Sequence, residues 1–232
     1  MPDNASLPAA RATLDTLTEA LPDLSRLALV YAPRRVREQT AVLLALDTRM
    51  AGLLRHSKEP MLARIRLAWW RESLQADPAG WPEGEPLLAS LRQWNGEHLG
   101  LTALVDGWEE LTGAEPLAAE GMQAMAEGRG AAFAAFARAI GREREADRAH
   151  DLGCRWGLTD LAMRLGKPGE RDTARTLAEA AIATRRPYVS RDLRPLLVLE
   201  ALSARRFRAG HDDGARSPAA LLQALRLGAF GR

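Results

Sequence analysis

The sequence predicts an all-α protein, and three observations support this prediction. Apolar residues recur at spacings of three and four, which is the period of an amphipathic helix. Valine, isoleucine, threonine and tyrosine are sparse and never alternate with polar residues over the length of a strand. Glycine and proline mark the ends of the periodic segments. The chain has 232 residues, 47% of them hydrophobic, and no obvious linker, so we expect one helical domain over residues 1–232.

Proline and glycine set the limits of the helices expected in the first half of the chain. Pro33 stops a short helix, and Pro60 stands at the first position of another, where proline is well tolerated. A loop rich in proline and glycine covers 77–84, and Gly113 ends the last helix of this half. The expected helices cover 7–20, a short segment ending at Tyr31, 34–55, 60–75, 86–95 and 99–112.

The second half shows the same alternation of periodic segments and breakers. Gly128-Arg129-Gly130 is expected to interrupt its first helix, and Gly166-Lys167-Pro168-Gly169 is a strong stop. A polar loop over 210–214 separates the last two helices. The expected helices cover 116–140, 143–165, 170–185, 191–208 and 217–229.

Composition excludes several classes of function. The net charge is only +2, and no run of lysine and arginine is interleaved with aromatic residues, so we expect no nucleic-acid partner. The segment 1–20 contains acidic residues and no long apolar core, unlike a signal peptide. The uncharged run 39–46 is too short to span a bilayer. We therefore expect a cytoplasmic protein without a transmembrane segment.

Metal ligands and nucleophile motifs are not apparent in the sequence. Cys154 is the only cysteine, so no intramolecular disulfide is possible, and we expect no cysteine-based metal site. None of the four histidines is expected to pair with another histidine or with the cysteine at ligand spacing. No Gly-x-Ser-x-Gly, Walker A or Gly-x-Gly-x-x-Gly pattern occurs. We therefore expect no bound metal ion.

Arg66 stands out because its helical neighbours at three and four positions are all apolar. A charge on an apolar face needs a partner, because an unpaired buried charge is very costly. Asp47 has similarly apolar neighbours on the preceding helix, at a comparable height from the turn. We predict that Asp47 and Arg66 face each other across this helix pair. The alternative is that Arg66 holds an anionic ligand.

Three further charges lie among apolar residues. Arg71 is expected at the rim of its helix, near Gln75. Arg129 is flanked by two glycines, which indicates a close approach of its backbone to another helix or to a ligand, and we favour another helix. Asp160 is predicted to form a local ion pair with Arg164, one turn away.

Three segments resemble the squalene/phytoene synthase family. The first contains Tyr31, the Glu59-Pro60 turn and the double-tryptophan helix around Trp69 and Trp70, which is the most specific marker. The others are Leu104-Val105-Asp106-Gly107-Trp108-Glu109 and the helix from Leu152 to Leu161, and together the segments span about 20–210. The resemblance implies an all-α bundle of the isoprenoid synthase type, in which two Asp-rich motifs on facing helices hold Mg²⁺ ions that bridge to prenyl diphosphates.

The sequence departs from this family at both Asp-rich motifs. The positions expected for the first motif hold Met50, Ala51 and Leu54, with only Asp47 nearby, and the segment 162–168 has no carboxylate pair. Without metal, the family's reaction loses its largest electrostatic contribution. The resemblance is therefore closer to a non-catalytic branch, which includes a mitochondrial respiratory complex I assembly factor and its bacterial relatives.

Two functions remain as expectations from this resemblance. The first is a non-catalytic assembly or accessory factor without cofactors. The second is a prenyl transferase or prenyl-diphosphate-binding protein with a remodelled site, and only this alternative calls for Mg²⁺. Residues that could line its cavity are Asp47, Arg66, Arg71, Arg129 and Tyr31.

The partners expected from the sequence are a client protein or a membrane-associated complex, and a prenyl diphosphate in the alternative function. The segment 217–230 carries leucines and a phenylalanine with arginines around them. This pattern suits a partner groove or a peripheral position at the inner membrane, and it equally suits packing on the domain.

Overall fold

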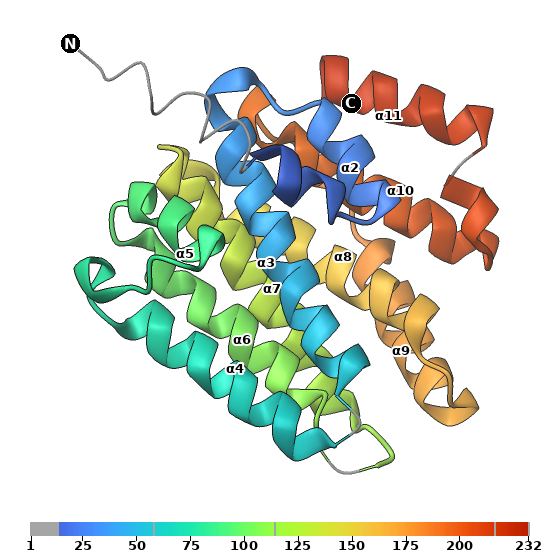
Figure 1. Ribbon diagram of the computed structural model, residues 1–232. Coiled ribbons are helices and arrows are strands. Elements are labelled where there is room, and N and C mark those ends of the chain that lie inside the picture. The colour runs from blue at the N-terminus through green and yellow to red at the C-terminus, as the bar shows by residue number, and fades with distance from the viewer. Residues whose placement is uncertain (1–13, 58, 114, 216, 232) are drawn as a thin grey trace.

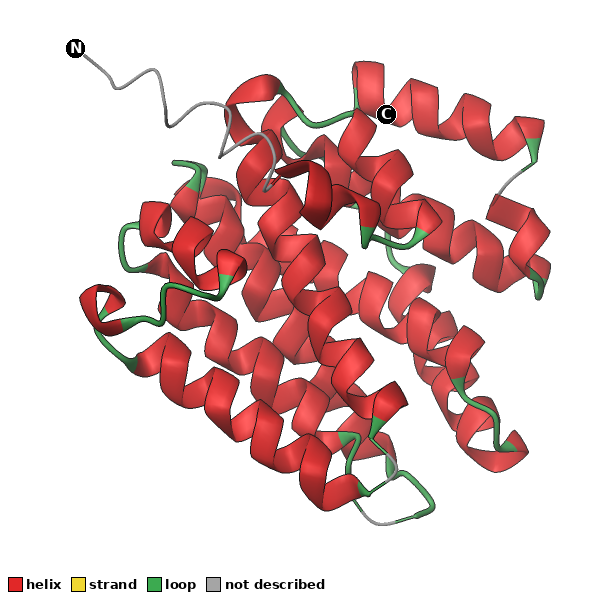
Figure 2. Ribbon diagram, in the orientation of Figure 1, coloured by secondary structure: helices red, strands yellow, loops and turns green. Residues whose placement is uncertain are grey.

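The computed structural model describes residues 14–57, 59–113, 115–215 and 217–231, and every regular element in these ranges is a helix (Figure 2). The prediction of an all-α bundle is confirmed. Residues 14–19 are helical, whereas 7–13 of the first expected helix lie outside the described residues. The main helices are α2 (Asp23–Val30), α3 (Arg37–His56), α4 (Pro60–Gln75), α5 (Pro86–Leu91), α6 (Thr102–Glu110), α7 (Ala119–Ala139), α8 (Ala146–Arg164), α9 (Pro168–Ala183), α10 (Arg194–Ala209) and α11 (Pro218–Phe230).

Helix α7 lies at the centre of the bundle (Figure 1). It packs along α8 on one side and α6 on another, and α3 crosses the same region. Its middle is buried, and Phe133 stacks on Trp156 of α8 with ring centroids 5.4 Å apart. α4 forms an outer edge against α6, while α10 carries α11 and α2 at the opposite end.

The expected interruption of α7 at Gly128-Arg129-Gly130 is wrong, because the helix runs through this segment. The glycines serve close packing instead. A Cβ atom on Gly128 would lie 2.3 Å from the carbonyl oxygen of Ala103 in α6. Tertiary contacts therefore outweigh the poor helix propensity of glycine, as expected for a close approach between helices.

Several helix boundaries also differ from the expected ones, and two of the differences have a clear cause. The segment expected as a helix over 86–95 is a short α-helix followed by a 3-10 turn over Arg92–Trp94, because Asn95 and Gly96 adopt left-handed conformations. α9 begins earlier than expected, at Pro168, because proline suits the first position of a helix as well as a stop.

Two peripheral helices expose apolar side chains. On α4, Met61, Ile65 and Trp69 face outward while Trp70 is buried. On α11 Ala220, Ala224 and Leu227 face the bundle, and the exposed apolar residues are Leu221, Leu222, Leu225 and Phe230. Among the described residues, no helix is both long and apolar enough to cross a membrane.

Candidate central ion-pair site

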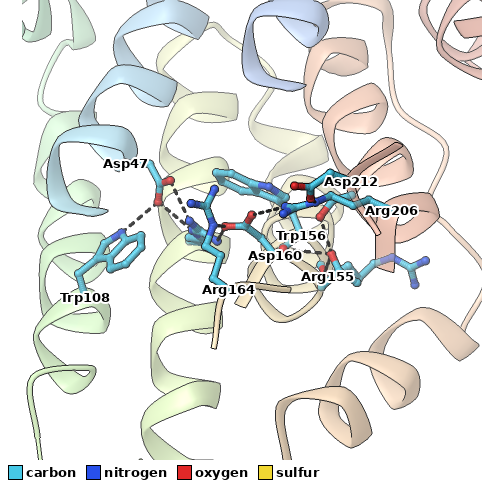
Figure 3. A network of polar contacts seen from close by, with 11 residues as sticks. Asp47, Trp108, Arg155, Trp156, Asp160, Arg164, Arg206 and Asp212 are labelled. Atoms are coloured by element: carbon cyan, nitrogen blue, oxygen red, sulfur yellow. Dashed lines mark hydrogen bonds and ion pairs between the residues drawn. The ribbon is translucent and has the colours of Figure 1, made fainter. Parts of the chain in front are cut away.

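Three buried charges meet at the centre of the bundle, each supplied by a different helix (Figure 3). Asp47 comes from the buried stretch of α3, Arg129 from the middle of α7 and Asp160 from the last turns of α8. Their exposed fractions are 6%, 2% and 4%. Because α3 and α8 both pack on α7, residues far apart in the sequence form one site.

Arg129 bridges the two carboxylates. Its Nε donates to Asp47 Oδ1 at 2.8 Å and its Nη2 donates to Asp47 Oδ2 at 2.9 Å, so this pair is bidentate. Its Nη1 donates to Asp160 Oδ2 at 3.1 Å. The planar guanidinium suits this geometry, because its donors match the spacing of carboxylate oxygens.

Two tryptophans enclose the guanidinium. The Cζ atom of Arg129 lies 4.1 Å from the ring centroid of Trp156 and 5.0 Å from that of Trp108. The indole Nε1 of Trp108 also donates to Asp47 Oδ1 at 3.0 Å. These contacts cover the guanidinium and add cation–π attraction, which is worth about 2 kcal/mol when desolvated.

The charges of this group stabilise one another. Burial by itself lowers the pKa of Arg129, but Asp47 and Asp160 outweigh this effect and raise it. Burial likewise favours a higher pKa for Asp160, yet Arg129 and Arg164 hold its pKa below the ordinary range. Arg129 is therefore a permanent cation, and Asp160 stays ionised to acidic pH.

The network continues from Asp160 towards solvent. Arg164 Nε donates to Asp160 Oδ2 at 2.8 Å, which confirms the predicted local pair. Arg206 of α10 lies 3.6 Å from Asp160 Oδ1, and its Nε donates to Asp212 at 2.6 Å. Figure 3 shows this chain of side chains running from the interior to the edge of α10.

Two hollows meet at this network. One has a volume of about 210 Å³ and opens between α2, α3 and α10, with Asp47 and Arg206 in its wall. The other has about 520 Å³ and lies between α3, α6, α7 and α8, with Glu170 of α9 in its wall. Arg129, Asp160 and Arg164 line both. The wall of the larger hollow is mainly apolar, with Leu54, Leu111, Leu117, Met125, Leu161 and Leu165.

The predicted pairing of Asp47 with Arg66 is wrong. Asp47 points towards α7 and α6, where Arg129 and Trp108 bind it. Arg66 is exposed, because α4 turns Ala63, Leu67 and Trp70 towards the core and leaves Arg66 on its outer face. The sequence spacing predicts how far each residue lies along its helix axis. It does not predict which neighbouring helix each side chain faces.

The other candidate residues have different surroundings. Arg71 forms ion pairs with Asp106 at 2.6 Å and with Glu109, so it fastens α4 to α6 as a rim residue. Tyr31 packs against Gly228 of α11, where a Cβ atom would overlap its ring. Of the five residues expected to line a cavity, only Asp47 and Arg129 line the central hollows.

Sequence reasoning did not identify Trp108, Trp156 or Arg206 as parts of the site. Trp108 belongs to the regular apolar face of its helix. No local sequence pattern distinguishes a core tryptophan from one whose indole donates to a buried carboxylate. The expectation that no histidine lies at ligand spacing from the cysteine is also wrong. His150 and Cys154 lie one turn apart on α8, and Glu127 lies beside them.

Comparisons of the chain with protein-family models, with curated proteins and with solved structures each gave no match.

Proposed function

We propose that this protein is a non-catalytic relative of the squalene/phytoene synthases that acts as an assembly or accessory factor. One observation carries the proposal. Facing helices α3 and α8 each present one buried carboxylate, and the cation between them is the guanidinium of Arg129. In the enzymes that the sequence resembles, carboxylates on facing helices bind metal ions instead.

The guanidinium of Arg129, which is part of the chain, cannot replace Mg²⁺ in such a reaction. Mg²⁺ needs near-octahedral oxygen ligands and usually keeps several waters. Here Arg129 occupies the position between the two carboxylates, and the indoles of Trp108 and Trp156 flank its guanidinium. The carboxylate charge is already neutralised, so the site offers little attraction to a divalent ion, and the leaving diphosphate of a prenyl substrate would lack its metal partner.

The direct test is turnover. Purified protein is incubated with farnesyl or geranylgeranyl diphosphate, Mg²⁺ and NADPH, and both organic products and released diphosphate are measured beside a catalytically competent family enzyme. We expect no product above the protein-free background. Mg²⁺-dependent formation of squalene, phytoene or their cyclopropyl intermediates would overturn the proposal.

The larger hollow favours a second candidate, a protein that binds a prenyl diphosphate without converting it. Its wall is mainly apolar, and Arg55 and Arg164 line both this hollow and the smaller one. Among the described residues Arg55 has no hydrogen-bond or ion-pair partner, so it is available for a phosphate oxygen.

A thermal-shift experiment with farnesyl diphosphate in EDTA separates this candidate from the first. A ligand that binds the native state raises its stability by mass action. The candidate predicts a shift in the wild type that Arg55→Ala reduces and that Arg66→Ala, an exposed arginine remote from the hollows, leaves unchanged. No shift, or equal shifts in both variants, removes the second candidate.

A further inference from the structure

A second cluster of ligand-bearing side chains lies between α7 and α8, apart from the central network. It consists of Glu127 on α7 and of His150 and Cys154 on α8. One potential ligand atom from each residue lies within 4.8 Å of the other two. None of the three lines either central hollow.

The helices hold this cluster together by backbone geometry. His150 and Cys154 are four residues apart, so α8 presents both on one face. Opposite them, α7 carries Gly130, where a Cβ atom would lie 2.6 Å from Cys154 Sγ and 2.9 Å from His150 Nε2. The missing side chain lets the thiol and the imidazole approach α7 closely.

The three side chains lie within reach of one metal ion, but their two close contacts use opposite nitrogens of the His150 ring. His150 Nε2 lies 3.2 Å from Glu127 Oε2, and His150 Nδ1 lies 3.5 Å from Cys154 Sγ. Zn²⁺ with its usual bond lengths places a nitrogen about 3.4 Å from an oxygen ligand and about 3.6 Å from a sulfur ligand. Because a metal takes one ring nitrogen, the imidazole must rotate until that nitrogen faces both Glu127 and Cys154. The Glu127 side chain, which is 66% exposed, is free to follow it.

The surroundings favour a cation. The surface hollow beside the cluster is lined by Glu110 and Glu127, together with Asp106, whose charge is shared with Arg71 of α4. His150 is partly exposed, so an ion can reach the cluster from solvent. A thiol, an imidazole and a carboxylate together suit a borderline ion such as Zn²⁺ better than Mg²⁺ or Ca²⁺, which prefer oxygen ligands.

We propose that Glu127, His150 and Cys154 form a Zn²⁺ site that joins α7 to α8. On binding, the Cys154 thiol releases its proton to solvent and binds as thiolate, one His150 nitrogen and one Glu127 oxygen complete three protein ligands, and water takes the fourth position. This inference does not depend on the proposed accessory function, because the central network takes no part in it.

Cobalt binding tests the site with a spectroscopic signal that only Cys154 can give. Because the chain contains a single cysteine, any thiolate-to-Co²⁺ charge-transfer band must arise from this residue. We expect tag-free protein to bind one equivalent of Co²⁺ with this band and tetrahedral d–d absorption, and Zn²⁺ to displace it. Zn²⁺ should also slow alkylation of Cys154 by iodoacetamide.

Matched variants decide the ligand set. Cys154→Ser should abolish the charge-transfer band, and His150→Ala and Glu127→Gln should each weaken Zn²⁺ binding by at least about tenfold. The controls Glu120→Gln on the same helix and His56→Ala elsewhere should bind as the wild type does, and circular dichroism checks that every variant folds. Absence of stoichiometric binding in the wild type, or unchanged Zn²⁺ affinity in a His150→Ala/Cys154→Ser variant, would overturn the proposal.

Discussion

Helix α8 contributes to two buried ion-pair networks, and their difference points to the functional region. On one side Asp160 joins Arg129 and Asp47. On the other side Arg155 Nε donates to Glu200 Oε1 of α10 at 3.0 Å, with exposed fractions of 2% and 0% for the two residues. Both networks pair buried arginine with buried carboxylate, so burial and residue type alone do not separate them.

Access separates the two networks. Arg155 also donates to the carbonyl oxygens of Ala181 at 2.8 Å and Thr184 at 3.2 Å, and Arg186 closes the pair by bonding Glu200. Neither Arg155 nor Glu200 lines the central hollows. We conclude that this sealed network fastens α8 to α10 and to the end of α9, whereas the central network lies where a ligand could reach it.

The largest expected effect is that of Arg129→Leu. This change leaves Asp47 and Asp160 facing each other without their shared cation, which should lower the free energy of unfolding by about 3–5 kcal/mol. Urea unfolding measures it. The double variant Asp47→Leu/Arg129→Leu should lose less, because the remaining Asp160 keeps Arg164. A double variant that is less stable than Arg129→Leu would contradict the account of the central bridge.

Glu200→Leu should lower the free energy of unfolding by roughly 3 kcal/mol, which is the lower end of the range for breaking a buried ion pair. Arg155 keeps its oxygen acceptors at the end of α9, and Arg186 is partly exposed and can turn to solvent. This variant should respond to Mg²⁺ and to farnesyl diphosphate as the wild type does in thermal-shift measurements. A changed response would show that the sealed network also serves a ligand.

Asp160→Asn tests how the charge of this carboxylate contributes to stability at different pH values. At neutral pH we expect the free energy of unfolding to fall by about 2 kcal/mol. The pKa of Asp160 is lowered in the folded protein, so its contribution to stability is present above the unfolded pKa of about 4 and is lost as pH falls through the folded pKa. The difference in stability between wild type and variant should therefore shrink below about pH 4. A difference that is constant down to pH 2 would contradict this.

Trp108→Phe should have the smallest effect and lower the free energy of unfolding by about 1 kcal/mol. It removes one hydrogen bond to Asp47 but keeps an aromatic ring beside Arg129. Chemical unfolding of Trp94→Phe gives a comparison, since the Trp94 Nε1 is buried without a partner among the described residues. An equal or larger loss in Trp94→Phe would assign the effect to packing rather than to the bond with Asp47.

The helices were predictable from sequence because each depends on local periodicity and breakers, and α4 begins at Pro60 as expected. The central site was predictable only in part. Arg129 and Asp47 stood out as charges among apolar residues, but 82 positions separate them, and no local pattern specifies which helix faces which. The i, i+4 spacing of His150 and Cys154 was visible in the sequence, whereas Glu127 joins them only through the packing of α7 on α8.

We propose that the Arg129 guanidinium occupies the position of a metal ion between the carboxylates of Asp47 and Asp160. The most direct test of this proposal is to measure the melting temperature of wild type and Arg129→Ala against Mg²⁺ concentration at constant ionic strength. We predict no response in the wild type and a rise in Arg129→Ala, whose two freed carboxylates gain a cation. A wild type stabilised by Mg²⁺, with an Arg129→Ala variant that does not respond, would contradict the claim.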